Sequence, residues 1–422
     1  MTLLFVGINI EFFRNLTHQY LSIEGSGLDG SGGIQVIAAI FICTSGIIAA
    51  RRGAWELIGR AYRKWVVLLT LYSVVLLVRG ITSLQVYNQA SILKLLLEWL
   101  PYVLFLAMFV GVREETWSVL NRVFVLHTTT GVIATVWAIA QVTAATITRE
   151  QALKISAMGM WALYAVPVLL LTWEKQNIFV RVIAILGMVL TLAIGFLTLT
   201  RSYVLKVLVW LVLFTISRRQ FRHKPVQEFN PSTNLALSLY MFIGGFTLLL
   251  FLIFPPERGG VVYERGQSLI ERFQYTILLN DGRLLEAQLV LDEMSSSDWL
   301  IGRGLTGQWE GYELYRTMRT GLHIGYLHLI FRGGIVLLLF FLVGPIFLGI
   351  KTLLSEHRNI TFAAAGVLVQ YMVDLAHLGF PEAKLWFVLI CLSMGICASS
   401  LNTEIQRETH RWQMHIAEEH IQ

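Results

Sequence analysis

Long apolar runs separated by short polar connections dominate the pattern along this chain. A helix that crosses a membrane needs about 20 mostly apolar residues, and about eleven runs approach that length. They lie near 33–50, 65–85, 92–112, 119–143, 158–173, 178–200, 202–217, 233–255, 324–350, 360–380 and 383–400. The pattern predicts an all-α polytopic membrane protein with about 11 transmembrane helices.

One connection is far longer than the others and divides the predicted helices into two groups. Residues 256–322 separate the eighth span from the ninth, and long loops in compact folds are usually functional or disordered. A short helix is predicted at 282–294, with Asp281 as N-cap and apolar residues at Leu284, Leu285, Leu289 and Leu291. The predicted segments are an extracytoplasmic N-terminal segment with or without a reduced first span (1–32), helices one to eight (33–255), the loop (256–322), helices nine to eleven (323–400) and a cytoplasmic tail (401–422).

Basic residues in two connections set the predicted orientation. They cluster in 51–64 and 216–224, which the positive-inside rule assigns to the cytoplasm. Alternation along the chain then places the loop 256–322 outside, on the periplasmic or outer face. The net charge of +6 therefore reflects topology, and we expect no nucleic-acid partner.

Composition excludes a water-soluble globular domain. The chain is 55% hydrophobic and only 14% charged, whereas soluble domains average about 25% charged residues. Cys43, Cys391 and Cys397 all fall inside apolar runs, so they are interpreted as small buried hydrophobic residues. They predict neither a disulfide framework nor a metal site.

The loop 256–322 is rich in arginine. It holds seven arginines, no lysine and ten acidic residues. The Glu-Arg pairs at 257–258, 264–265 and 271–272 are interpreted as surface ion pairs. Arg283 differs because it lies in the first turn of the predicted helix, where free N–H groups favour an anion. Arg303 differs because it lies between two glycines. An arginine fork binds phosphate oxygens in pairs.

Residues 302–307 satisfy G-x-G-x-x-G, but no strand precedes them in a βαβ unit, so a dinucleotide site is rejected. Two interpretations remain open for Gly302, Arg303 and Gly304. The turn either directs backbone N–H groups toward a diphosphate, or it is a tight turn with no ligand.

Two polar residues near the predicted outer membrane boundary are candidate catalytic groups. Arg201 ends the sixth span and is a functional candidate by default, although an arginine at a helix end can also snorkel to the interface. His323 precedes the ninth span and could act as a base, although a lone interfacial histidine is more often structural. Asp374 and His377 are spaced i, i+3 and share a helix face. Lys94 and Glu98 are spaced i, i+4 and are interpreted as a structural pair.

Three motifs make the chain similar to the O-antigen ligase and O-antigen polymerase superfamily of bacterial membrane glycosyltransferases. The first is the outer-face arginine in Thr200-Arg201-Ser202. The second is Asp281-Gly282-Arg283 opening a helix in a long outer loop, followed by the glycine-rich turn at 300–304. The third is His-x-x-Tyr-Leu at 323–327, followed by Gly333 and Gly334. The chain departs from the family at Ile324, where asparagine is frequent, and in its N-terminal span.

The resemblance implies a metal-independent, cofactor-free transferase of the GT-C type in the bacterial inner membrane, with its site on the periplasmic or outer face. It implies transfer of a glycan from an undecaprenyl-diphosphate carrier to lipid A–core (ligase) or to a growing glycan chain (polymerase), and the two remain open. Arg201, Arg283 and His323 would be catalytic. Arg303, Gly302, Gly304 and Tyr326 would bind substrate.

Two other function classes remain open. A transporter or flippase for a lipid-linked glycan or another anion fits the many spans and the arginine-rich loop, although no clear repeat or broken midplane helix is seen. A non-catalytic scaffold of a polysaccharide assembly is the third alternative. Membrane lipids are expected partners in all three cases.

Overall fold

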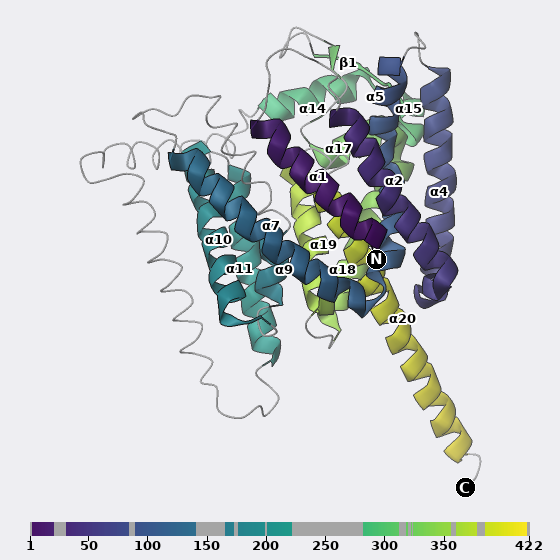
Figure 1. The fold of residues 1–422 in the computed structure, drawn as a ribbon. Coiled ribbons are helices and arrows are strands. Elements are labelled where there is room, and N and C mark those ends of the chain that lie inside the picture. The colour runs from purple at the N-terminus through teal and green to yellow at the C-terminus, as the bar shows by residue number, and fades with distance from the viewer. Residues whose placement is uncertain are drawn as a thin grey trace.

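The structure of the chain is a computed structural model. It describes residues 2–20, 31–83, 89–140, 165–172, 176–198, 201–221, 282–311, 318–319, 322, 324–355, 360–377 and 385–419. These residues are almost wholly helical (Figure 1), and a pair of two-residue strands is the exception within them. The predicted all-α class is therefore confirmed for the described part of the chain.

The helices in chain order are α1 (Thr2–Tyr20), α2 (Ser31–Ala49), α3 (Trp55–Leu57), α4 (Gly59–Thr82), α5 (Gln89–Trp99), α6 (Met108–Gly111), α7 (Glu114–Ala140), α9 (Ala165–Leu171), α10 (Ile178–Thr198), α11 (Arg201–Phe221), α14 (Gly282–Glu293), α15 (Ser296–Ile301), α17 (Gly325–Leu338), α18 (Gly344–Leu354), α19 (Ile360–His377) and α20 (Leu385–Glu419). Single turns of other helix types are η1 (Ala50–Ala54), η2 (Leu100–Tyr102), η3 (Leu104–Ala107) and η7 (Leu339–Val343). The strands β1 (Trp309–Glu310) and β2 (Met318–Arg319) pair antiparallel.

Five of the described helices are long and apolar enough to cross a membrane, and a bent pair would make a sixth. The five are Gly33–Leu57, Gly59–Thr82, Glu115–Trp137, Ile178–Gly195 and Gly325–Leu354, and the pair Ser91–Tyr102 and Leu104–Gly111 is bent by 43°. This is the architecture of a multi-pass membrane protein.

Three further predicted spans coincide with shorter apolar helices at Tyr203–Ile216, Ile360–Leu375 and Phe387–Thr403. The predicted span at 233–255 and half of the one at 158–173 lie outside the described residues. The total of about eleven spans stays a prediction.

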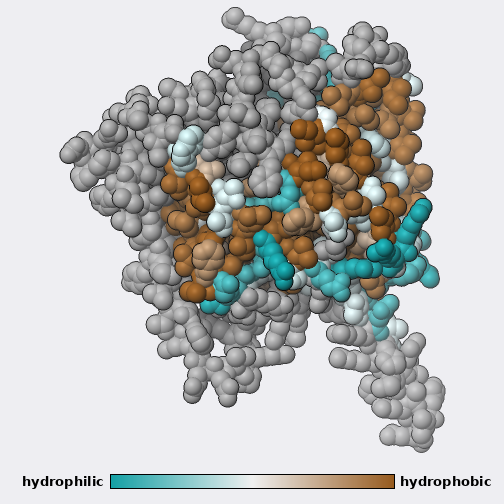
Figure 2. Space-filling view, viewed as in Figure 1, coloured by the Kyte–Doolittle hydropathy of each residue, from teal (hydrophilic) through white to brown (hydrophobic). Residues whose placement is uncertain are grey.

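The two ends of α4 lie in different surroundings. Its first turns lie within the basic stretch 51–64, and Figure 2 shows hydrophilic residues bordering the hydrophobic face of the bundle there. Near its other end, Arg79 donates to the backbone carbonyls of Ile301 and Gly302 at the end of α15. Because a helix of this length extends roughly 36 Å, α15 and the basic stretch lie at opposite ends of the bundle. We call these the loop end and the basic end.

Antiparallel packing extends this assignment to α11 and α17. The turn after α15 hydrogen-bonds to α17, so α17 begins at the loop end, and α18 continues toward the basic end. α19 packs along α18 and returns to the loop end. Lys206 near the start of α11 pairs with Asp374 near the end of α19, so α11 also starts at the loop end. Its last residues, which include Arg218 and Arg219, lie at the basic end.

The N-terminal segment contains a helix that belongs to the bundle. Leu4, Ile8 and Phe12 of α1 are buried in the main core. A Cβ added at Gly7 would lie 2.8 Å from the carbonyl oxygen of Ala38, so α1 and α2 approach closely. Whether this helix crosses the membrane stays a prediction.

The last helix extends beyond the bundle. α20 has 35 residues and continues without a break from the last predicted span into the predicted tail (Figure 1). The boundary expected at residue 400 is therefore not a break in secondary structure.

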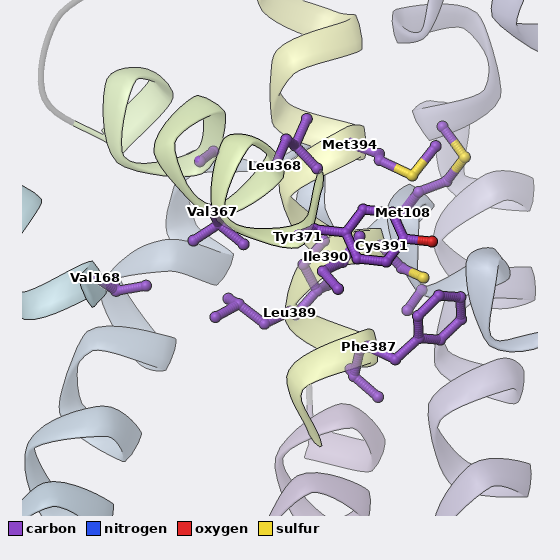
Figure 3. Packing of buried hydrophobic residues seen from close by; sticks show 14 of the residues in the cluster. Met108, Val168, Val367, Leu368, Tyr371, Phe387, Leu389, Ile390, Cys391 and Met394 are labelled. Atoms are coloured by element: carbon purple, nitrogen blue, oxygen red, sulfur yellow. The ribbon is translucent and has the colours of Figure 1, made fainter. Parts of the chain in front are cut away.

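The centre of the core lies where α19 and α20 meet. Figure 3 shows Tyr371 and Leu368 of α19 packed among Phe387 and Cys391 of α20 and Met108 of α6. Gly395 of α20 and Gly111 of α6 allow these two helices to approach closely, because a Cβ at either glycine would collide with a backbone carbonyl of the facing helix. Small residues commonly permit such close contacts between membrane helices.

We predict that Gly395→Ala destabilises the protein by about 1–3 kcal/mol, because the added methyl group overpacks the contact with Met108. Gly33→Ala is the matched control, since no atom lies within 4 Å of a Cβ there, and alanine is the better helix former by up to about 1 kcal/mol. Thermal unfolding of both variants in the same detergent checks this. Equal stability of the two variants would contradict the packing argument.

Candidate functional site

A small layer covers the loop end of the bundle and has a hydrophobic core of its own. Val290 of α14, Met294 directly after α14, Trp309 of β1, and Leu327 and Phe331 of α17 are buried together. The predicted helix at 282–294 is confirmed as α14, although its buried face is centred on Val290 and Leu285 is exposed. This core attaches the layer to the start of α17.

α15 begins at a capping box. The Ser295 side chain accepts from the backbone N–H of Asp298, and the Asp298 carboxylate accepts from the backbone N–H of Ser295. The helix ends at Gly302, whose φ of 68° and ψ of 177° form a region that almost only glycine occupies. The capping box and this glycine fix where the following turn begins.

The turn at 302–304 is docked on a break in α17. The break lies at Gly333 and Gly334, and Gly334 has a φ of 66°. The N–H of Arg303 donates to the carbonyl of Phe331 at 2.7 Å, and the N–H of Gly304 donates to the carbonyl of Arg332 at 3.0 Å. A hydroxyl from α4, that of Tyr72, donates to the carbonyl of Gly333 at 2.5 Å.

These bonds use part of the backbone of the G-x-G-x-x-G segment. The N–H groups of Gly302 and Gly307 donate to the carbonyls of Asp298 and Gly304, and those of Arg303 and Gly304 donate to α17. These four N–H groups therefore have partners within the protein. Binding of substrate by this turn stays a prediction.

Arg303 is held by carboxylates. Its guanidinium pairs with Glu293 at 2.9 Å and with Asp298 at 3.3 Å, and it donates to the backbone carbonyls of Glu293 and Gln308. Burial raises the pKa of Asp298, but hydrogen bonds from Ser295 and Arg303 outweigh burial and leave that pKa below its usual value. Arg303 thus joins α14 to α15, and its predicted contact with substrate remains untested.

Two other arginines hold the carbonyls of the same turn from opposite sides. Arg79 donates to the carbonyls of Ile301 at 2.6 Å and Gly302 at 3.0 Å. The buried Arg332 donates to the carbonyls of Gly304 and Leu305.

A carboxylate from α5 neutralises one of these arginines. Glu98 accepts from Arg332 at 2.8 Å. The expected pairing of Glu98 with Lys94 is therefore wrong, and Lys94 is exposed.

The backbones of two sequence-predicted catalytic residues lie at one end of the bundle. Arg201 is the first residue of α11 and Arg283 is the second residue of α14. Their backbones lie at the loop end, and their side chains lie outside the described part. His323 also lies outside it, directly before Ile324, the N-cap of α17. Tyr326, in the first turn of α17, is 41% exposed.

A buried ion pair joins α11 to α19 shortly after Arg201. Lys206 of α11 and Asp374 of α19 approach to 3.1 Å, and their side chains are only 2% and 4% exposed. The amide of Gln370 donates to the other carboxylate oxygen at 2.8 Å. Sequence reasoning identified Asp374 as polar near the outer boundary but missed Lys206, because nothing in the local pattern indicates a partner on another helix.

No group of three or more His, Cys, Asp or Glu able to hold a metal ion is found among the residues that the structure describes. The predicted independence from a metal and a cofactor stays a prediction.

Comparison with known proteins identifies no relative: no family model, curated protein or solved structure matches the chain.

We predict that Gly302→Ala destabilises the protein more than Gly304→Ala. Both glycines have positive φ, so each substitution introduces backbone strain of order 1–3 kcal/mol. At Gly302 the new Cβ would also collide with the backbone of Arg332 and Gly333, whereas the space beside Gly304 is open. Unfolding midpoints of the two variants check the order, and a reversed order would contradict docking on α17.

We also predict that Asp374→Ala costs about 3–5 kcal/mol of stability, because it leaves the ammonium group of Lys206 buried without its carboxylate. Replacing both residues, as Lys206→Met with Asp374→Leu, should cost much less. The surface pair of Arg63 and Glu56 supplies the control, since Glu56→Gln should change stability by under about 1 kcal/mol. Equal effects of Asp374→Ala and Glu56→Gln in thermal unfolding would refute the prediction.

Proposed function

We propose that this protein is a metal-independent membrane glycosyltransferase of the GT-C type, acting in the bacterial inner membrane on its periplasmic or outer face. It would move a glycan from an undecaprenyl-diphosphate carrier onto a sugar acceptor in cell-surface polysaccharide assembly. One observation carries the proposal. The backbones of Arg201 and Arg283 and the start of α17, which follows His323 directly, lie at the same end of the bundle, opposite the basic end.

The chemistry requires a group that stabilises a leaving diphosphate and a group that takes a proton. Arg201 and Arg283 would bind the phosphate oxygens as the glycosidic C–O bond to the carrier breaks. His323 would accept the proton of the acceptor hydroxyl as its oxygen forms the new bond to the anomeric carbon. The carrier diphosphate leaves with the electron pair, and its polyprenyl chain would lie against the apolar helices.

The acceptor distinguishes the two forms of this function. A ligase would transfer the glycan to lipid A–core, and a polymerase would join a growing glycan chain and a further lipid-linked unit. Both forms use the same donor chemistry at the loop end.

A transporter or flippase is the second candidate, and the buried pair of Lys206 and Asp374 favours it. Charged residues inside membrane helices commonly mark ion or substrate pathways. The hydroxyl of Tyr371 and the side-chain oxygen of Gln370 are also buried without a hydrogen-bond partner among the described residues. Movement of a lipid-linked glycan across liposomes, without glycan transfer, would favour this candidate.

The test is transfer by purified protein from an undecaprenyl-diphosphate-linked glycan, with and without lipid A–core, with products separated by size. We expect Arg201→Ala and His323→Ala each to reduce the rate by at least ~10²-fold, the scale typical of losing an oxyanion donor or a general base. Arg60→Ala is the control, because Arg60 is exposed at the basic end. A ladder without added acceptor indicates a polymerase, and a product only with lipid A–core indicates a ligase. Full activity of both variants would refute the mechanism.

A further inference from the structure

Arg79 carries a positive charge that the described part of the protein does not neutralise. Its two hydrogen bonds go to the neutral carbonyl oxygens of Ile301 and Gly302. A guanidinium has five N–H donors, so these bonds leave about three unused. No ion pair joins Arg79 to any carboxylate among the described residues.

Other arginines at both ends of the bundle are paired with carboxylates. At the loop end, Arg303 has Glu293 and Asp298, and Arg332 has Glu98. At the basic end of the same helix as Arg79, Arg63 has Glu56. Arg79 instead lies on a partly exposed face of α4 with its charge open to an external anion.

The two helices that meet at Arg79 both expose apolar side chains. On α4, Val75 lies one turn from Arg79 and is exposed, as are Val78 and Ile81 in the same end of the helix. On α15, Trp299 and Leu300 are exposed. Figure 2 shows hydrophobic residues covering the bundle face between its two ends. Tryptophan is enriched at the boundary between lipid tails and head groups, and arginine side chains near helix ends extend to the same boundary.

Hydroxyl groups lie on the polar side of this surface. The hydroxyls of Ser83 and Thr306 are 2.5 Å apart, and that of Ser83 also bonds to the carbonyl of Arg79. They join the end of α4 to the turn that follows α15. Arg79 is thus fixed in position by both elements before any ligand binds.

We infer that Arg79 binds the phosphate of a membrane lipid that lies against α4 and α15. A guanidinium presents paired N–H groups that match phosphate oxygens, and the apolar residues of both helices would contact the acyl or prenyl chain. An anionic phospholipid and a polyprenyl diphosphate share this chemistry. The inference does not depend on the proposed glycan transfer, because binding requires no acceptor and no reaction.

The test is native mass spectrometry of the purified full chain, titrated separately with phosphatidylglycerol and with undecaprenyl diphosphate. We expect Arg79→Gln to reduce the bound fraction at least fivefold for one or both lipids. Arg79→Lys keeps the charge and should lose less than twofold. Arg63→Gln is the matched control on the same helix, since Arg63 is already paired with Glu56, and it should bind as the wild type does.

The two lipids separate the possible sources of the phosphate. If Arg79→Gln loses binding of phosphatidylglycerol alone, the lipid bound at Arg79 is a structural phospholipid. If it loses binding of undecaprenyl diphosphate alone, the bound lipid is a carrier lipid. Thermal unfolding of each variant shows whether the turn after α15 remains intact. Wild-type binding of both lipids by Arg79→Gln would overturn the inference, as would equal losses in folded Arg79→Lys and Arg79→Gln.

Discussion

The break in α17 leaves carbonyl groups that its own helix does not satisfy, and in a membrane environment such groups must find donors within the protein. Phe331, Arg332 and Gly333 find them in the N–H groups of Arg303 and Gly304 and in the hydroxyl of Tyr72. The turn that supplies two of these donors has orphan carbonyls of its own, and arginines from α4 and α17 satisfy them. The loop layer and the bundle therefore complete each other, and neither has its backbone satisfied alone.

This mutual dependence determines where the candidate chemistry can lie. The segment from α15 to the start of α17 is fixed at both sides, by the docked turn at one and by the buried cluster around Trp309 and Leu327 at the other. The start of α17, which directly follows His323 in the chain, is thereby held at the loop end. Arg201 is held there separately, because the pair of Lys206 and Asp374 fixes α11 against α19. Two independent contacts thus bring distant parts of the chain to one level of the bundle.

The sequence predicted the positions of helices, because these depend on local composition. Apolar runs marked most of the described helices, and the helix predicted at 282–294 is α14, although its predicted N-cap Asp281 lies outside the described residues. It did not predict interactions that join distant segments. Arg332 looked like part of a span, and its partner Glu98 is 234 positions away. Arg79 lies inside the apolar run 65–85, and nothing in that run indicates its contact with α15. The glycine motif indicated a turn, but which groups its N–H donors meet depends on the break in α17, which is tertiary information.

The charges at the loop end come both from the loop and from the helices of the bundle. The loop 256–322 has ten acidic residues against seven arginines, so its own sequence is negative. The docked turn nevertheless contacts two arginines that the loop does not contain, Arg79 of α4 and Arg332 of α17. Among the described residues, only Arg332 of the two pairs with a carboxylate, that of Glu98. Because the bonds to the turn use neutral carbonyl oxygens, they fix the position of Arg79 without cancelling its charge. A cation held rigidly in this way requires little reorganisation when an anion binds, which is the condition under which electrostatic stabilisation is most effective.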